Sequence, residues 1–465
     1  MKTIYNYLSE YSMSDYYGFH MPGHKRNRSL IDNGIPYHMD ITEINGFDDL
    51  HHAEGIIKHA EERVRRLFCA DESHFLVNGS TAGILSAVLG VTRKGDKILV
   101  ARNCHKSVYH AVYMNELQPV YVYPEYRADT GMNGEMVPEK IEKILQEDRE
   151  IKAVVIVSPT YDGVVSDVEK IAEIVHACGK PLIVDEAHGA HFGFHPYFPE
   201  NANVKGADVV IHSVHKTLPS LTQTALIHIN GEIVDRERVR MYLHMLQSSS
   251  PSYILMASID ECMEFLEKKG VDTFARYVDN LKKMRRELGK LKHLRLIDSG
   301  NYDFSKLVIS VKDTQITSIE LTNRLREQYH LEMEMTAGDY ILAMTSVGDQ
   351  EEGFQRFVQA LKEIDASLCE RENDGKEGAA FGNLPEAEIV FKSSDLVETE
   401  MGTYTEWEES KGKISLEYAY LYPPGIPIIV PGERIGSEII SCLKRYRELG
   451  FSIEGPKKDG CLKCF

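Results

Sequence analysis

The sequence predicts an α/β protein whose mostly parallel sheet is covered by helices on both faces. Between about residues 73 and 230, short runs of β-branched residues alternate with amphipathic stretches. Such alternation is typical of buried parallel sheets. At 465 residues the chain is also too long for one ordinary core, so we expect two or three compact units.

Seven segments of this region are predicted strands, because each is a short apolar run bounded by turn residues. They span residues 73–80, 96–103, 118–125, 153–160, 180–188, 207–216 and 225–231. Helical periodicity lies between them, over residues 81–93, 137–148 and 167–179. The sequence therefore predicts a seven-stranded, mostly parallel sheet.

A second pattern begins beyond residue 250. Residues 252–291 predict long helices that lead to a small α+β unit, with strands at 306–313 and 339–347 and helices at 318–328 and 353–368. A polar, charged stretch at 369–388 predicts a linker, and a helix is expected near 436–448. We predict five segments: an N-terminal segment (1–70), a large domain (71–300), a small α+β domain (301–372), a linker (373–386) and a C-terminal domain (387–465).

The chain is acidic, with 71 acidic against 53 basic residues and a formal net charge of −18. Nucleic acid and anionic membranes both require basic patches, so neither is an expected partner. A cationic small molecule is compatible with this charge. No apolar run approaches the roughly 20 residues that span a bilayer.

Cysteine usage and the N-terminus predict a cytoplasmic protein. The eight cysteines show no disulfide framework spacing, and the first 19 residues lack the pattern of a signal peptide. Cys461 and Cys464 form a lone C-x-x-C, for which an exposed thiol pair is expected rather than a zinc site. Histidine pairs such as His188 and His191 lack a completing acidic or cysteine ligand, so no metal is expected.

Four polar features follow predicted strands, at the sheet edge where open α/β sheets bind ligands. Residues 78–83, NGSTAG, form a glycine-containing turn into a helix, which suits a phosphate. Asp185 and Lys216 end two other strands, and His105 follows a fourth. Taken singly, each has an ordinary explanation as a helix cap, a surface turn, a solvated lysine or a loop histidine.

Taken together, these features meet the requirements of pyridoxal phosphate. A lysine forms a Schiff base with the cofactor, an aspartate keeps the pyridine nitrogen protonated, and a helix start binds the phosphate. The order of the turn, Asp185 and Lys216 along the chain agrees with this use. We therefore predict pyridoxal 5'-phosphate as the cofactor.

Longer motifs resemble the Orn/Lys/Arg decarboxylase family, in the short Gram-positive form that has no wing domain. They are FHMPGHKR (19–26), GFDDLHHAEGIIKHAE (46–61), NGSTAG (78–83), RNCHKS (102–107), SPTYDGV (158–164), VDEAHGAH (184–191), SVHKTLPSLTQ (213–223) and YPPGIPIIVPGE (422–433). The resemblance implies a fold-type I, aspartate aminotransferase-like enzyme whose residues 71–300 bind pyridoxal phosphate. It implies decarboxylation of a basic L-amino acid, either lysine or arginine, with ornithine also open.

The resemblance also implies roles for single residues. Lys216 would form the Schiff base, Asp185 would pair with the pyridinium nitrogen, and His105 would stack on the ring. His188 would lie near the phenolic oxygen and the departing carboxylate, and Thr160 would line the cofactor edge. The implied phosphate ligands are Gly79, Ser80, Thr81, Ser213 and His215.

An obligate homodimer with shared active sites is implied as well. Residues 248–253, SSSPSY, resemble the place where such dimers lend a hydroxyl to the neighbour's phosphate, and residues 1–70 would lie against the active site of the dimer. Acid resistance and polyamine synthesis are both plausible physiological roles.

Alternatives remain at this point. The same fold also serves pyridoxal-phosphate aminotransferases and lyases, and a cofactor-free scaffold would show no visible absorbance. A substrate with a long cationic side chain requires carboxylates or other hydrogen-bond acceptors at the far end of the pocket. The candidate acceptors are Glu43, Asp48, Asp49 and Glu433, each of which is equally well explained as an ordinary acidic residue.

Overall fold

The computed structural model describes residues 2–16, 21–22, 24–25, 34–297, 300–369, 384–396, 401–421 and 425–465. Most of the predicted linker 373–386 lies outside these residues, as do parts of the motifs at 19–26 and 422–433. Contacts divide the chain into two compact units, Met1–Val91 with Pro181–Arg276 and Thr92–Lys180 with Tyr277–Phe465. The five predicted segments stay a prediction.

The central sheet has seven strands, as predicted, in the order β1-β9-β8-β7-β6-β2-β3. The first unit contributes β1 (Glu72–Leu76), β9 (Ala225–Ile229), β8 (Val209–His212) and β7 (Leu182–Asp185). The second contributes β6 (Ile151–Val157), β2 (Lys97–Ala101) and β3 (Gln118–Val122). Strand β9 pairs antiparallel with both β1 and β8, whereas β7–β8, β2–β6 and β2–β3 are parallel. The mostly parallel sheet is thereby confirmed.

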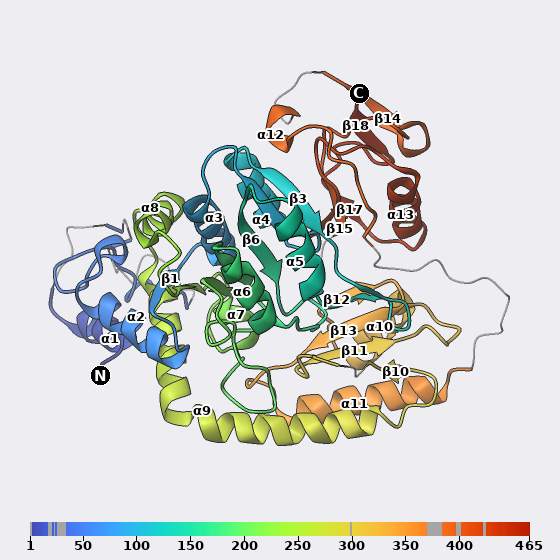
Figure 1. Cartoon of the computed structure of the whole chain (residues 1–465). Helices are drawn as coiled ribbons and strands as arrows, with labels where there is room; N and C mark the ends of the chain where they lie inside the picture. Colours follow the sequence, from blue (N-terminus) through green and yellow to red (C-terminus); the bar gives the residue numbers. More distant parts are fainter. Residues whose placement is uncertain are drawn as a thin grey trace. The chain divides into compact units, whose positions relative to one another are not determined.

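The first unit packs helices around its strands. They are α1 (Ile4–Met13), the short η1 (Leu50–His52), α2 (Ile56–Leu67), α3 (Gly79–Val91), α7 (Val214–Thr217), α8 (Arg236–Leu246) and the start of α9 (Tyr253–Leu288). Helices α3 and α8 pack closely. A Cβ at Gly90 in α3 would lie only 2.6 Å from Val239 Cγ2 in α8, so a larger residue would not fit there. The long helix α9 continues into the second unit (Figure 1).

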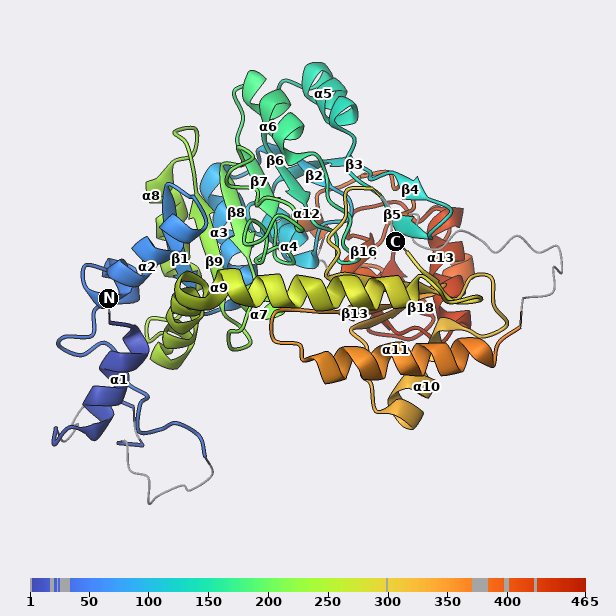
Figure 2. The same ribbon diagram turned by 90° about the horizontal axis from the view of Figure 1, so that it is seen from below.

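The second unit begins with α4 (Lys106–Met114), the hairpin β4 (Tyr126–Arg127) and β5 (Met132–Asn133), α5 (Pro138–Glu147) and α6 (Val168–Ala177). Helices α5 and α6 lie side by side (Figures 1 and 2). A four-stranded sheet follows, with β10 (Arg295–Leu296), β11 (Lys306–Ser310), β12 (Met335–Ala337) and β13 (Tyr340–Met344). It is accompanied by α10 (Ser318–Tyr329) and α11 (Glu351–Ala366).

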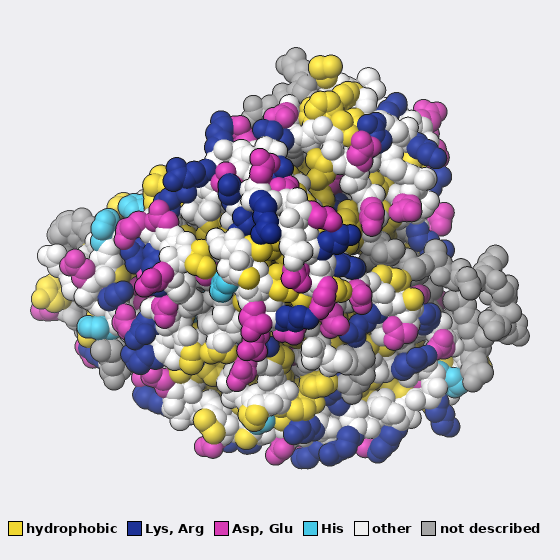
Figure 3. All heavy atoms as spheres, in the orientation of Figure 1, with side chains coloured by type: hydrophobic (Ala, Val, Ile, Leu, Met, Phe, Trp, Pro, Cys, Tyr) yellow, Lys and Arg dark blue, Asp and Glu magenta, His cyan; other side chains and the backbone are white. Residues whose placement is uncertain are grey.

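The C-terminal part of this unit has a core of its own. Its elements are α12 (Ser393–Leu396), β14 (Thr403–Glu406), η2 (Trp407–Glu409), β15 (Ala419–Leu421), β16 (Ile426–Ile429), α13 (Ser437–Glu448), β17 (Ile453–Glu454) and β18 (Cys461–Cys464). Trp407, Ile429, Ile439 and Leu462 pack together in that core. On the face drawn in Figure 3, acidic and basic side chains are interspersed. In the part of the chain that the structure describes, no helix has the length and apolar character to cross a membrane.

Two sequence predictions are wrong in detail. Strand β8 ends at His212, so Lys216 lies in the four-residue helix α7 and not on the strand. Cys461 and Cys464 lie in β18 and are 5% and 0% exposed, so they are not an exposed thiol pair. Three residues apart in a strand, their side chains also point to opposite faces.

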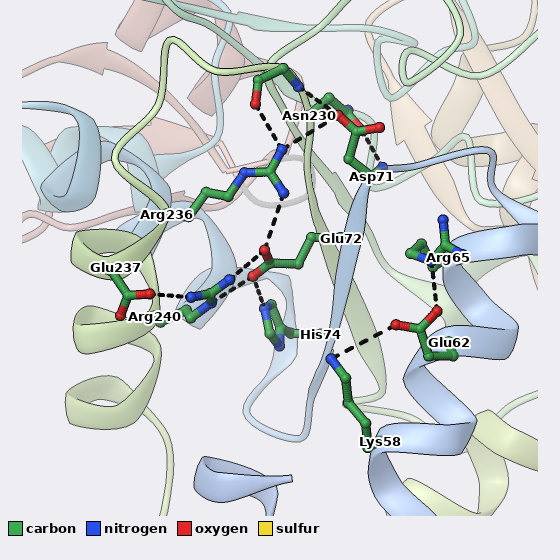
Figure 4. Close-up of polar contacts among 11 residues, drawn as sticks. Lys58, Glu62, Arg65, Asp71, Glu72, His74, Asn230, Arg236, Glu237 and Arg240 are labelled. Atoms are coloured by element: carbon green, nitrogen blue, oxygen red, sulfur yellow. Dashed lines mark hydrogen bonds and ion pairs between the residues drawn. The ribbon is translucent and has the colours of Figure 1, made fainter. Parts of the chain in front are cut away.

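A charged cluster joins β1 to α8 in the first unit, where Glu72 pairs with Arg236 and Arg240 (Figure 4). Glu72 Oε1 lies 2.6 Å from His74 Nε2, and Glu72 Oε2 lies 2.6 Å from Arg240 Nη2. On its other side, His74 Nδ1 lies 3.4 Å from Glu61 Oε1. Although burial opposes protonation, Glu61 and Glu72 raise the pKa of His74 to about 9. The imidazole is therefore positively charged at neutral pH.

This cluster predicts a loss of stability at alkaline pH. Because the pKa of His74 is raised from 6.5 to about 9 on folding, its contribution is complete below pH 6.5 and disappears as the pH rises through about 9. The free energy of unfolding in urea should fall by about 1–3 kcal/mol more in the wild type than in His74→Gln between pH 6 and pH 10. If the free energy of unfolding fell equally in the two proteins over this pH range, the charge of His74 would not contribute to stability.

Candidate active site

The turn predicted to bind phosphate lies at the start of α3. Gly79 begins this helix with φ +72°, a conformation that favours glycine, and its N–H donates to Gln223 O at 3.0 Å. The first N–H groups of a helix have no acceptor within it and attract anions. Ser213 Oγ, just beyond β8, donates to Ser80 Oγ at 2.9 Å. The structure thus brings together the hydroxyls of two predicted phosphate ligands, Ser80 and Ser213. The third, Thr81, directly follows Ser80 and is exposed.

Lys216 and His188 meet in the first unit. Lys216 Nζ lies 3.0 Å from His188 Nε2, and His188 is buried in the turn that follows β7. Asp185, the last residue of β7, is 3% exposed, and its Oδ1 accepts the Ala187 N–H at 3.1 Å. Burial raises the pKa of Asp185, and the positive charge of Lys216 opposes that rise. A buried carboxyl of this kind is stabilised as an anion by a cationic partner.

His215 precedes Lys216 in α7 and has a defined tautomer. Its Nδ1 lies 2.8 Å from Thr224 O, and because a carbonyl only accepts, Nδ1 carries the proton. Burial lowers the pKa of His215, so the neutral ring has an acceptor at Nε2. A contact from this nitrogen to phosphate requires that the imidazole be protonated.

His105 and Thr160 belong to the second unit. His105 is the N-cap of α4: its Nδ1 accepts the Ser107 N–H at 3.3 Å and lies 2.9 Å from Ser107 Oγ. Two contacts from one residue orient the ring, a role for Ser107 that sequence analysis missed although it lies within the RNCHKS motif. Thr160 follows β6, and its Oγ1 accepts the Val164 N–H at 3.0 Å.

The predicted substrate carboxylates near the N-terminus differ in their partners. The carboxylate of Asp48 accepts backbone N–H groups from residues 49, 54, 55, 57 and 58. Although burial opposes the shift, these donors lower the pKa of Asp48. Asp49 caps η1 by accepting the His51 N–H at 2.8 Å. Glu43 Oε1, in contrast, is buried without a hydrogen-bond partner among the described residues.

Glu433 is paired with a buried arginine in the second unit. Its Oε2 accepts the Val430 N–H at 2.8 Å and lies 3.4 Å from Arg102 Nη2, and the two residues are 1% and 0% exposed. Arg102 also donates to Pro427 O at 2.6 Å and Ile428 O at 3.1 Å. The pair therefore joins the end of β2 to the β16 segment, which sequence analysis did not detect.

Removing one partner of this pair should destabilise the protein. A buried charge without its counter-ion costs about 3–5 kcal/mol, so Glu433→Ala should lower the free energy of unfolding in urea by this amount. The matched control is Glu388→Ala, which removes the exposed partner of Arg434 and should cost less than about 1 kcal/mol. A variant with unchanged stability but a greatly raised KM would instead place Glu433 at the substrate.

A lysine, an aspartate and a hydroxyl-lined helix start at the end of a mostly parallel sheet define a class: the fold is that of the fold-type I pyridoxal-phosphate enzymes. Lysine decarboxylase A of Pseudomonas aeruginosa superposes with a TM-score of 0.85 at 21% identity, covering 100% of this chain and 80% of that structure. At this identity the likeness concerns the fold alone.

Sequence comparison identifies the family. Residues 2–352 match the Orn/Lys/Arg decarboxylase major domain, and residues 380–457 match the C-terminal domain of the same family. The arginine decarboxylase of Halalkalibacterium halodurans is 33% identical, covering 95% of this chain and 92% of that protein. The arginine decarboxylase of Bacillus subtilis is 32% identical, covering 98% and 95%. The chain belongs to the Orn/Lys/Arg decarboxylase family.

Proposed function

We propose that this chain uses pyridoxal phosphate to decarboxylate a basic L-amino acid to the corresponding amine and CO₂. The observation that carries the proposal is the contact of 3.0 Å between Lys216 Nζ and His188 Nε2, next to the buried carboxyl of Asp185. Relatives that match nearly the whole chain are named arginine decarboxylases, which supports arginine as the first candidate substrate. Lysine and ornithine are the alternatives.

The residues present fit the cofactor. Ser80, Ser213 and the start of α3 offer donors to a phosphate, and Lys216 offers an amine to the aldehyde. Asp185 is a buried acid that a cationic ring nitrogen would stabilise. When bound, pyridoxal phosphate supplies an electron sink for the pair of electrons that departing CO₂ leaves behind.

The chain's own residues then orient groups and move protons. Asp185 would hold the ring nitrogen of the bound cofactor protonated through its negative charge, an effect that would act in the transition state. His105, whose ring Ser107 orients, would stack on the cofactor, and Thr160 would line its edge. Decarboxylation takes up one proton at Cα, and Lys216 Nζ and His188 Nε2 form a hydrogen-bonded pair that can hold it.

Among the predicted substrate carboxylates, we propose Glu43 for the cationic end of the substrate. Its Oε1 has no hydrogen-bond partner among the described residues and so keeps acceptor capacity. The carboxylate of Asp48 is occupied by backbone N–H groups. Glu433 Oε1 also has no hydrogen-bond partner among the described residues, but the charge of Glu433 is paired with Arg102.

A substrate panel tests the proposed reaction. The purified protein is supplied with pyridoxal phosphate and L-arginine, L-lysine or L-ornithine, and both CO₂ and the amine product are measured. We expect equal amounts of CO₂ and amine from at least one of the three. A keto acid as the main product would instead identify an aminotransferase, and the absence of CO₂ from all three would contradict the proposal.

The assembly and setting of the enzyme are further proposals. A homodimer with shared active sites follows from the resemblance of residues 248–253, and size measurement by light scattering tests it. No disulfide joins any of the eight cysteines, all of which the structure describes, and this is compatible with the cytoplasmic location we propose. Acid resistance, since the reaction consumes a proton, and polyamine synthesis, since the product is a basic amine, are the two physiological roles that the proposed reaction would suit.

A further inference from the structure

Four buried polar side chains form a continuous hydrogen-bonded chain across the first unit's strands. Ser73 Oγ in β1 lies 2.8 Å from His228 Nδ1 in β9. His228 Nε2 lies 3.0 Å from His212 Nδ1 in β8, and His212 Nε2 lies 2.7 Å from Glu186 Oε2 just beyond β7. Their exposed fractions run from 0% to 4%. The mechanism proposed above uses none of the four.

The chain of contacts can be satisfied in full without charging either imidazole. Ser73 donates to His228, His228 donates to His212, and His212 donates to the carboxyl oxygen Oε2 of Glu186, so each nitrogen is either a donor or an acceptor. Glu186 Oε2 also accepts the Ala202 N–H at 2.9 Å. Burial lowers the pKa of both His212 and His228 and raises the pKa of Glu186 to about 8, which agrees with neutral groups along this chain of contacts. The ring of Phe68 lies 5.0 Å from each imidazole and completes the burial.

The end of this chain at Glu186 lies directly beside the candidate site in sequence. Glu186 follows Asp185, and His212 precedes Ser213 and lies four residues before Lys216. The contact between Glu186 and His212 therefore links the segment that carries Asp185 to the segment that carries Lys216. Backbone pairing supports the same link, since the Glu186 N–H donates to Ile211 O at 3.0 Å.

Glu186 also supports the turn that carries His188. The Gly189 N–H donates to Glu186 O at 2.8 Å, and a Cβ at residue 189 would lie 2.6 Å from Glu186 Cγ and 2.9 Å from the Phe192 ring. The stem of Glu186 thus packs directly under this turn, and only glycine leaves room for it. One side chain therefore touches the His188 turn with its stem and the β8 end with its carboxylate.

We propose that Glu186 and His212 are positioning residues that hold the Asp185–His188 segment and the Ser213–Lys216 segment at the spacing the cofactor needs. This inference rests on the proposed function. It predicts that loss of the Glu186–His212 contact weakens cofactor binding and changes the environment of Lys216, beyond any loss of stability.

The experiment compares variants of the full chain by titration with pyridoxal phosphate, following the visible absorbance band of the bound cofactor. Glu186→Ala and His212→Ala should raise the concentration for half-saturation by ~10–100-fold and shift or weaken the band, because small displacements of reacting groups are costly. Glu186→Gln should restore binding, since its amide oxygen can accept both N–H groups that Glu186 Oε2 accepts. Gly189→Ala, which removes no polar group, should reproduce the defect through its clash with Glu186.

Ser73→Ala is the matched control, because it breaks the same chain of contacts at the end far from Asp185 and Lys216. It should lower thermal stability while changing cofactor affinity by less than about twofold. If Ser73→Ala and Glu186→Ala weaken cofactor binding equally, or if Glu186→Ala and Gly189→Ala keep the wild-type affinity and band, the four residues are only core packing and the inference is overturned. A wild-type protein without any visible band would instead overturn the proposed function.

Discussion

Replacing Lys216 with alanine is expected to abolish both decarboxylation and the visible absorbance band of the Schiff base. The Schiff base requires a primary amine, and Lys216 Nζ is the amine that lies 3.0 Å from His188 Nε2 beside Asp185. The alanine variant keeps the hydroxyls of Ser80 and Ser213 as phosphate donors. It should therefore still bind the cofactor, but without the covalent bond. The mass of the intact protein after borohydride treatment measures the covalent bond directly, because reduction of the Schiff base fixes the cofactor to its amine.

The control for this variant is Lys268→Ala, which removes an exposed lysine on α9 that pairs with Glu264. It should keep the wild-type band and rate. Thermal unfolding of both variants checks that the fold persists. If borohydride treatment fixed the cofactor to Lys216→Ala with the same added mass as in the wild type, another amine would hold the cofactor and the assignment of Lys216 would be wrong.

Strand prediction succeeded where the sequence signal is local. Buried parallel strands such as β6 and β7 are short apolar runs bounded by turn residues, and that pattern needs no knowledge of distant contacts. Helix α8 was missed because only Val239 and Leu243 of its 11 residues are buried, so its apolar stripe is narrow. Helix α7 has four residues, too few for a helical period, and Lys216 was therefore assigned to the preceding strand.

The candidate site was predictable to the extent that its residues follow strands. Asp185 and Ser213 come at or just after the carboxyl ends of β7 and β8, which are parallel neighbours, so their proximity follows from the fold class. Contacts between distant segments were not predictable. Arg102 and Glu433 are separated by 331 residues, and the Glu186–His212 contact depends on the order and pairing of the strands. The sequence also does not distinguish an aspartate whose carboxylate binds backbone N–H groups, such as Asp48, from one that binds a substrate.

Asp185→Asn is expected to lower kcat by about 10²–10³-fold, the usual cost of removing one aligned electrostatic group from a transition state. The amide keeps the size of the side chain, but it has no negative charge with which to hold a ring nitrogen protonated. Cofactor affinity should fall as well, because the buried carboxyl gains a cationic partner on binding and the amide gains none. Rates normalised to bound cofactor separate the two effects.

Asp208→Asn provides a matched control at the opposite edge of the same strands. Asp208 is also 3% exposed, but it lies just before β8 begins, and its Oδ2 accepts the Leu182 N–H at 2.7 Å. Its replacement should reduce stability and leave kcat per bound cofactor near the wild-type value, because no reacting group lies at that edge in the proposed site. Equal losses of kcat in the two variants would mean that Asp185 acts through the fold and not through its charge.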